Sequence, residues 1–201
     1  MKKYKNIIIA VVVVILGGAV IALALNGGMS QGQSGGQNMD GMGGGDQMVQ
    51  GDPFSEKNPV AGNELKFSAK DVDGNDVDES IFKENKLTII NLWGTFCPPC
   101  IEEMPSIQKI QDEYKDKVKV IGLLVDSTEK TDDVKEVLKE KNITYTNIIA
   151  NQKLCDDLVL KFGYVPVTLF VDSEGKIIEQ YIAGDATYDM LKQHVDELLA
   201  E

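Results

Sequence analysis

The chain has 201 residues, 43% of them apolar and 26% charged, which suits one globular domain with additional segments. Its 32 acidic residues outnumber 20 basic residues, for a net charge of -12, and every basic residue is lysine. An acidic chain without arginine, whose planar guanidinium grips phosphate, is not expected to bind nucleic acid. One histidine, His194, excludes a histidine-rich metal site and argues against a histidine-based catalytic triad. Three cysteines are too few for a disulfide-stapled miniprotein.

The N-terminus predicts a single membrane-spanning helix. Residues 1–6 form a basic stub, and residues 7–25 carry no charge. As a helix, that run would be ~28 Å long, close to the thickness of a hydrocarbon core. Because the lysines precede it, the stub is expected in the cytoplasm and the rest of the chain outside. A cleaved signal giving a secreted form is the alternative, but the run exceeds the usual signal core of about 7–15 residues.

Residues 26–52 predict a disordered linker. Ten of the 19 glycines lie in this stretch, together with Gln, Ser and Asn. Such a composition buries too little apolar surface to offset the entropy of ordering. Four methionines, Met29, Met39, Met42 and Met48, could bind Cu(I) through their thioethers. Because no Cys or His accompanies them, we interpret them as tolerated residues of a low-complexity linker.

Residues 53–201 alternate between strand and helix patterns and predict one α/β domain. The expected strands are 87–93, 118–125, 143–150, 167–171 and 176–182, with an N-terminal hairpin that starts at 65–71 and turns at 73–75. The expected helices are 98–115, one capped by Thr131 or Asp132, 152–162, and one capped by Thr187. A βαβ start and a ββα finish predict a mixed sheet with helices on both faces.

Cys97 and Cys100 form a Cys-Pro-Pro-Cys motif where a buried strand passes into a helix. The helix dipole and unpaired amide groups at a helix N-terminus favour the thiolate, so the pKa of Cys97 should lie below its ordinary value. This placement predicts a solvent-facing Cys97, which attacks a substrate disulfide, and an inward Cys100, which resolves the mixed disulfide. A zinc site would need a second ligand pair, and only Cys155 and His194 remain. We therefore expect a redox pair and neither a metal nor a cofactor.

Two segments resemble the TlpA/ResA-like branch of the thioredoxin superfamily. Residues 91–105, NLWGTFCPPCIEEMP, resemble its active-site signature, and residues 163–175, GYVPVTLFVDSEG, resemble its cis-proline strand and following turn. The resemblance covers residues 53–201. It implies a thioredoxin-like fold with an N-terminal β-hairpin and a central insertion, tethered to the membrane outside the cytoplasm. It also implies thiol–disulfide exchange, usually as a reductant of chosen protein partners.

The resemblance makes Glu103 the expected proton shuttle for Cys100. Thioredoxin-like proteins usually keep a buried Asp on the strand before the motif, whereas this chain has Asn91, which cannot take up a proton. Glu103 lies one helical turn after Cys100, and an apolar surrounding would raise the pKa of its carboxyl group. A solvated surface glutamate is the alternative. A Glu103→Gln change is expected to leave folding nearly unaffected.

The substrate-binding residues are expected around the cysteine pair. The Val165–Pro166 bond should be cis, so that the Val165 backbone can pair with a substrate strand. Trp93 and Phe96 flank the motif as an apolar rim for substrate docking or for core packing. Cys155 shares a helical stripe with core residues and should be buried without a redox role. His194 is expected to lie on the flank of a helix and to take no part in the reaction.

Together these features predict a membrane-anchored thiol–disulfide oxidoreductase that acts most simply as a reductase of protein disulfides. A membrane electron donor would have to keep the dithiol reduced, because the space outside the cytoplasm is oxidising. One alternative is an oxidant of secreted proteins, and another is a copper-binding module that uses the dithiol and the linker methionines. The sequence leaves apocytochromes, methionine sulfoxide reductases and spore-envelope proteins open as substrates.

Overall fold

A computed structural model describes residues 57–126 and 131–200 of the chain. Within these ranges the elements are β1 (Ser68–Lys70), β2 (Asp76–Asp78), η1 (Glu79–Glu84), β3 (Leu87–Trp93), α2 (Pro98–Glu113), β4 (Val118–Leu124), α3 (Thr131–Glu140), β5 (Thr146–Ile149), α4 (Gln152–Leu154), η3 (Cys155–Val159), α5 (Leu160–Phe162), β6 (Val167–Asp172), β7 (Ile177–Ala183) and α6 (Tyr188–Ala200). The expected anchor at 7–25 and the expected linker lie outside them. No helix in the described part is long and apolar enough to cross a membrane.

The central sheet is mixed, as predicted, with the strand order β5-β4-β3-β6-β7. β3, β4 and β5 run parallel to one another. β6 pairs antiparallel with β3, and β7 pairs antiparallel with β6. β3 lies in the middle and is buried along its whole length, which explains its continuous apolar sequence. The predicted N-terminal hairpin is also present, because β1 pairs with β2 in a separate antiparallel sheet.

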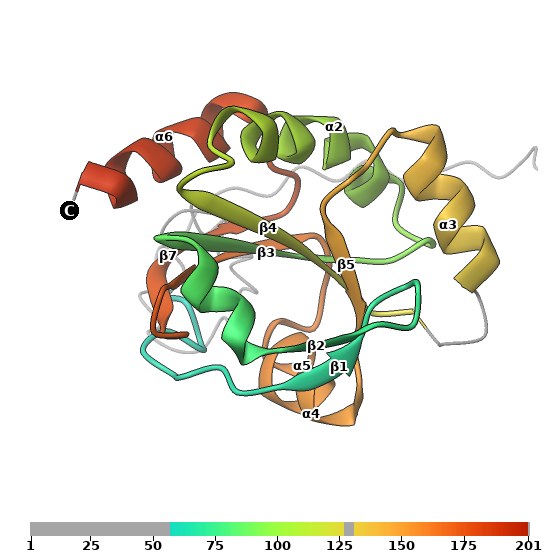
Figure 1. Ribbon diagram of the computed structural model, residues 1–201, viewed down its shortest axis with the longest axis horizontal. Helices are drawn as coiled ribbons and strands as arrows, with labels where there is room; N and C mark the ends of the chain where they lie inside the picture. Colours follow the sequence, from blue (N-terminus) through green and yellow to red (C-terminus); the bar gives the residue numbers. More distant parts are fainter. Residues whose placement is uncertain (1–56, 127–130, 201) are drawn as a thin grey trace, which may run out of the picture. The chain divides into compact units, whose positions relative to one another are not determined.

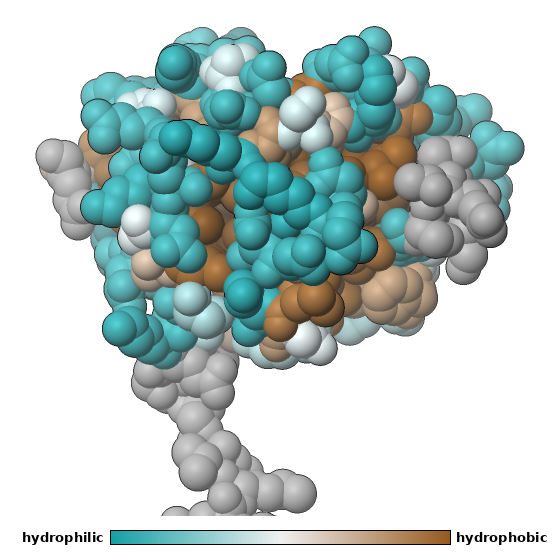
Figure 2. Space-filling view, turned by 90° about the horizontal axis from the view of Figure 1, so that it is seen from below, coloured by the Kyte–Doolittle hydropathy of each residue, from teal (hydrophilic) through white to brown (hydrophobic). Residues whose placement is uncertain are grey.

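Helices cover both faces of the sheet (Figure 1). α2 and α6 pack on one face, where Ile107 and Leu191 join Ile89 of β3 in one apolar cluster. The other face is covered by β1, the segment before it and the helical segment around Leu158, which pack on Ile90 of β3. On the face seen from this second side, hydrophilic residues surround smaller apolar areas (Figure 2).

The helix expected at 152–162 differs from the prediction in its middle. η3 is a π-helical turn, in which the Leu160 amide donates to the Cys155 carbonyl group. The wider turn changes which residues face inward, so Leu154 and Leu158 are buried and Cys155 is only half-buried. The prediction of a buried Cys155 is therefore wrong, although partial burial still raises the pKa of its thiol.

Candidate active site

The cysteine pair lies at the step from β3 to α2 and forms a disulfide. Cys97 is the N-cap of α2, and its Sγ accepts a hydrogen bond from the Cys100 amide at 3.3 Å. Pro98 and Pro99 occupy the first helical turn, where a missing amide donor costs nothing. This arrangement places the outer sulfur at the positive end of the helix dipole, which favours a thiolate once the disulfide is reduced.

Cys97 is less exposed than the sequence predicted, whereas Cys100 faces inward as expected. Cys97 is 5% exposed and Cys100 is fully buried, so the expectation of a solvent-facing Cys97 is wrong for the disulfide form. The reason is packing: both cysteines belong to an apolar cluster with Trp93 and Met104, and Val165 packs against it. The order of exposure is nevertheless the expected one. Cys97 is therefore the member of the pair that a substrate sulfur can reach from solvent.

The predicted cis peptide bond between Val165 and Pro166 is present. β6 begins one residue later at Val167, which pairs with Leu92 of β3. The cis-proline loop is thereby held beside the end of β3 that leads into the cysteine motif. Val165 precedes the strand ladder and packs against the cysteine cluster, and its pairing with a substrate strand stays a prediction.

Trp93 and Phe96 have opposite environments. Trp93 is fully buried, and its Nε1 donates to Asn147 Oδ1 at 2.9 Å, so the expectation that it contacts substrate is wrong. The central strand is covered on both faces, and its last side chain therefore lies inside the protein. Phe96 is 65% exposed, directly before Cys97, and it remains a candidate for substrate contact.

Glu103 lies inside the protein, on the buried face of α2. Its side chain is 4% exposed. Oε1 accepts a hydrogen bond from Asn91 Nδ2 at 2.7 Å, and Oε2 accepts one from the Ala186 amide at 2.6 Å. Burial raises the pKa of its carboxyl group to about 7 and the nearby Asp185 charge adds to this, while the two hydrogen bonds oppose it. A carboxyl group with this pKa can accept and return a proton near neutral pH.

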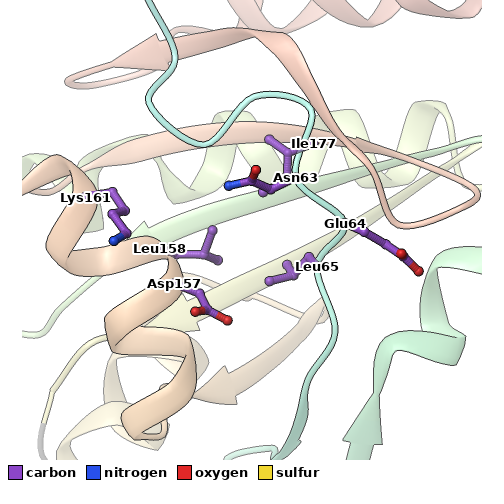
Figure 3. A pocket seen from close by; sticks show the side chains of 7 residues that line it. All are labelled: Asn63, Glu64, Leu65, Asp157, Leu158, Lys161 and Ile177. Carbon is purple, nitrogen blue, oxygen red and sulfur yellow. The ribbon is translucent and has the colours of Figure 1, made fainter.

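A small cavity connects Glu103 with the surface. It has a volume of about 180 Å³ and is lined by Pro99, Glu102, Glu103, Ser106, Asp185, Ala186 and Thr187. The first four come from α2, and the other three form the connection into α6. This cavity gives the buried carboxyl group a path to solvent that does not pass the sulfurs. A larger cavity of about 420 Å³ lies elsewhere, between residues 63–65, residues 157–161 and Ile177 (Figure 3), and contains none of the predicted site residues.

Asp126 is a site residue that the sequence analysis missed. Its Oδ1 accepts a hydrogen bond from the Thr95 amide at 2.9 Å, and its Oδ2 accepts one from the Thr95 hydroxyl group. The contact fixes the loop that carries the motif to the end of the neighbouring strand. Gly94 leaves room for this contact, because a Cβ atom there would lie 2.5 Å from the Phe96 ring and 2.6 Å from Asp126 Oδ1. The sequence feature that could have indicated this role is the position of Asp126 directly after the predicted strand 118–125, which pairs in parallel with β3.

The described residues show no arrangement for a metal ion. Within 57–126 and 131–200, no group of three or more His, Cys, Asp or Glu side chains is placed to hold one. The methionines of the copper alternative lie outside these ranges. Cys155 lies on the helical segment that covers the opposite face of the sheet from α2. Independently of this, the Cys97–Cys100 disulfide at the start of α2 supports thiol–disulfide exchange.

Comparison with known proteins agrees with this chemistry. The Redoxin family model matches residues 59–197. The thiol-disulfide oxidoreductase ResA of Oceanobacillus iheyensis is 32% identical over 136 residues, which cover 67% of this chain and 68% of that protein. ResA of Bacillus thuringiensis is 27% identical over 146 residues, covering 71% and 80%. The thioredoxin domain of a thiol-disulfide oxidoreductase from Bacteroides vulgatus superposes with a TM-score of 0.56 at 25% identity, covering 68% of this chain and 96% of that domain.

Proposed function

The chain belongs to the Redoxin family as a ResA-like thiol–disulfide oxidoreductase, and we propose that it reduces disulfides of selected proteins outside the cytoplasm while anchored to the membrane. The observation that carries the proposal is the combination of a disulfide at the N-terminus of α2 with a buried carboxyl group on the same helix. ResA-like relatives support protein disulfides as the substrate class.

The first step is attack by the reduced protein on a substrate disulfide. The Cys97 thiolate forms a bond with one substrate sulfur, and the substrate disulfide breaks. The other substrate sulfur leaves as a thiolate and takes a proton from solvent. Cys97 is the attacking sulfur because it is the N-cap of α2 and retains the residual exposure of the pair. The exposure of Phe96 next to Cys97 and the packing of Val165 against the cysteine cluster support a role for both in contacting the substrate segment.

The second step regenerates the disulfide and releases the substrate. The Cys100 thiol gives its proton to the Glu103 carboxylate, and the resulting thiolate attacks Cys97 Sγ. The bond between Cys97 and the substrate breaks, and the second substrate sulfur leaves with its electron pair. Two electrons have then passed from the dithiol to the substrate. A pKa of about 7 suits Glu103 for this transfer, because both of its protonation states are populated at neutral pH.

Reduction is favoured over oxidation by the residues between the cysteines. The residues between the cysteines are Pro98 and Pro99, and this dipeptide lacks the histidine that would make the motif resemble that of strong oxidants. A reductase outside the cytoplasm has to be recharged, so a membrane electron donor must reduce the Cys97–Cys100 disulfide after each cycle. The uncharged run at residues 7–25 supports anchoring next to such a donor.

The proposal is tested with insulin as a model protein disulfide. The reduced full-length chain should reduce insulin, Cys97→Ser should be inactive, and Cys100→Ser should accumulate a mixed disulfide. Glu103→Gln should slow the reaction at neutral pH and flatten its pH profile, whereas the matched Glu102→Gln should not. Equal profiles for wild type and both Gln variants would contradict the shuttle. Trapping on Cys100→Ser in whole cells would then distinguish apocytochromes, methionine sulfoxide reductases and envelope proteins as substrates.

A further inference from the structure

Asn91 contains a buried polar atom that the fold leaves without a partner. The residue lies in the middle of β3 and is fully buried. Its Nδ2 donates to Glu103 Oε1 at 2.7 Å and is 3.3 Å from Thr168 Oγ1 of β6. Its Oδ1 is buried with no hydrogen-bond partner among the described residues. A buried carbonyl oxygen without a hydrogen bond lowers the stability of the folded protein. Its position beside the proposed proton shuttle suggests that it has a partner in another state of the site.

The two oxygens of Glu103 both face donors. Asn91 Nδ2 and the Ala186 amide each offer hydrogen atoms, which suits an ionised carboxylate. A protonated carboxyl group has an O–H of its own and needs an acceptor instead. The Ala186 amide is part of the backbone and can only donate. Asn91 is the partner that can change, because rotation of its amide by about 180° exchanges the nitrogen and the oxygen.

We propose that the Asn91 amide turns over when Glu103 takes up a proton, so that Nδ2 donates to the carboxylate and Oδ1 accepts from the carboxylic acid. The inference rests on the proposed proton transfer from Cys100 to Glu103. Thr168 can accompany the rotation, because its hydroxyl group can accept from Nδ2 and donate to Oδ1. The proton moves from the Cys100 sulfur to Glu103, and no covalent bond of Asn91 changes. Asn91 is thus a positioning residue that gives both protonation states of Glu103 a partner.

Among the other titratable groups around Glu103, the Asp185 charge adds to the rise in its pKa, and none of these groups hydrogen-bonds to its carboxyl group. Asp185, in the loop before α6, and Glu102, on α2, line the same cavity. Tyr145, just before β5, is near enough for the charge of Glu103 to add to the burial that raises the pKa of its phenol. Cys100 lies one turn earlier on α2. Asn91 instead bonds directly to Glu103, so its amide should report the protonation state itself.

The test follows both side chains by nuclear magnetic resonance in the oxidised full-length chain. Glu is labelled with 13C and Asn with 15N, and spectra are recorded from pH 5 to pH 9. The 13C shift of the Glu103 carboxyl carbon follows its protonation. The Asn91 amide proton that bonds to the carboxylate is expected downfield at high pH. It should lose this downfield shift with the same pH midpoint as the carboxyl carbon. In Glu103→Gln the side-chain amide of residue 103 needs an acceptor, so Asn91 should show its low-pH signal at every pH. Glu102→Gln should leave the titration unchanged.

A downfield Asn91 amide proton that persists while Glu103 becomes protonated would overturn the inference. So would a Glu103→Gln variant whose Asn91 signal matches the high-pH form of the wild type. Neither result touches the proposed function, which insulin reduction by wild type and Cys97→Ser tests, or the proton shuttle, which the insulin rates of Glu103→Gln and Glu102→Gln test. Conversely, equal insulin rates combined with a moving Asn91 signal would remove the shuttle while the amide rotation stands.

Discussion

At the scale of single residues, the site depends on a carboxyl group that the fold withdraws from water. Three elements meet at Glu103: α2 carries it, β3 provides the Asn91 donor, and the loop before α6 provides the Ala186 amide. Burial dominates over these two bonds and shifts the pKa upward. The expectation that Glu103→Gln leaves folding nearly unaffected assumed a surface-accessible side chain, whereas Glu103 is buried and accepts two hydrogen bonds. Gln keeps one acceptor for the Ala186 amide, and its NH₂ group then requires Asn91 to present Oδ1.

Glu103 makes the stability of the protein depend on pH. The pKa of its carboxyl group is about 7 in the folded protein against an ordinary value of 4.5, so the folded state holds the proton more tightly. The favourable contribution is complete below pH 4.5 and is lost as pH rises through 7. The loss amounts to about 3 kcal/mol. Urea unfolding across this range should show wild type losing stability relative to Glu103→Gln as pH rises. A difference that does not change with pH would contradict the buried, titrating carboxyl group, and Glu102→Gln serves as the control.

Asp126 should control the shape of the motif loop through its two bonds to Thr95. Asp126→Ala leaves the Thr95 amide without its partner and should cost about 1–3 kcal/mol of unfolding free energy. Asp126→Asn keeps an acceptor for the amide, and its NH₂ group can donate to the hydroxyl oxygen, so it should stay near wild type. Urea unfolding and the rate of reaction with a small aromatic disulfide measure both effects. Equal losses in Ala and Asn variants would point to charge rather than to these hydrogen bonds.

At the scale of elements, the start of α2 determines which cysteine reacts. Cys97 is the helix cap, Cys100 is fully buried, and partial burial raises the pKa of the Cys155 thiol. Cys97 should therefore be alkylated first by iodoacetamide in the reduced protein, because the helix N-terminus favours its thiolate. Mass spectrometry of samples quenched at successive times identifies the order. Faster alkylation of Cys155 would show that the helix N-terminus does not activate the motif.

Local sequence predicted the parts of the site that local structure determines. The strand, the cysteine motif and the helix follow each other along the chain, and the cis bond has its own short signature, so these were found. Trp93 was misplaced because an all-apolar strand does not reveal which of its residues reaches the surface. The contact between Glu103 and the Ala186 amide was out of reach, because a backbone donor 83 residues away leaves no mark in the sequence. The π-helical turn at Cys155 likewise depends on tertiary packing.

At the scale of the whole molecule, the apolar rim of the site should distinguish protein substrates from small ones. Phe96 is 65% exposed beside Cys97, where a protein segment would cover it and a small disulfide would not. Phe96→Ala should therefore slow insulin reduction by about ten-fold or more, because burying one aromatic side chain contributes about 1.5–3 kcal/mol. Its rate with a small aromatic disulfide should stay near that of wild type. A loss of equal size with both substrates would show that Phe96 shapes the motif and does not contact the substrate.

The direction of electron flow is the central claim, and the reduction potential of the Cys97–Cys100 pair tests it most directly. The full-length chain is equilibrated with glutathione or dithiothreitol buffers of known potential, and the fraction oxidised is measured by alkylation and mass spectrometry. A reductase predicts a potential of about -200 to -280 mV, as in thioredoxin-like reductants. A potential near about -120 mV would contradict the account and make the protein an oxidant of secreted proteins.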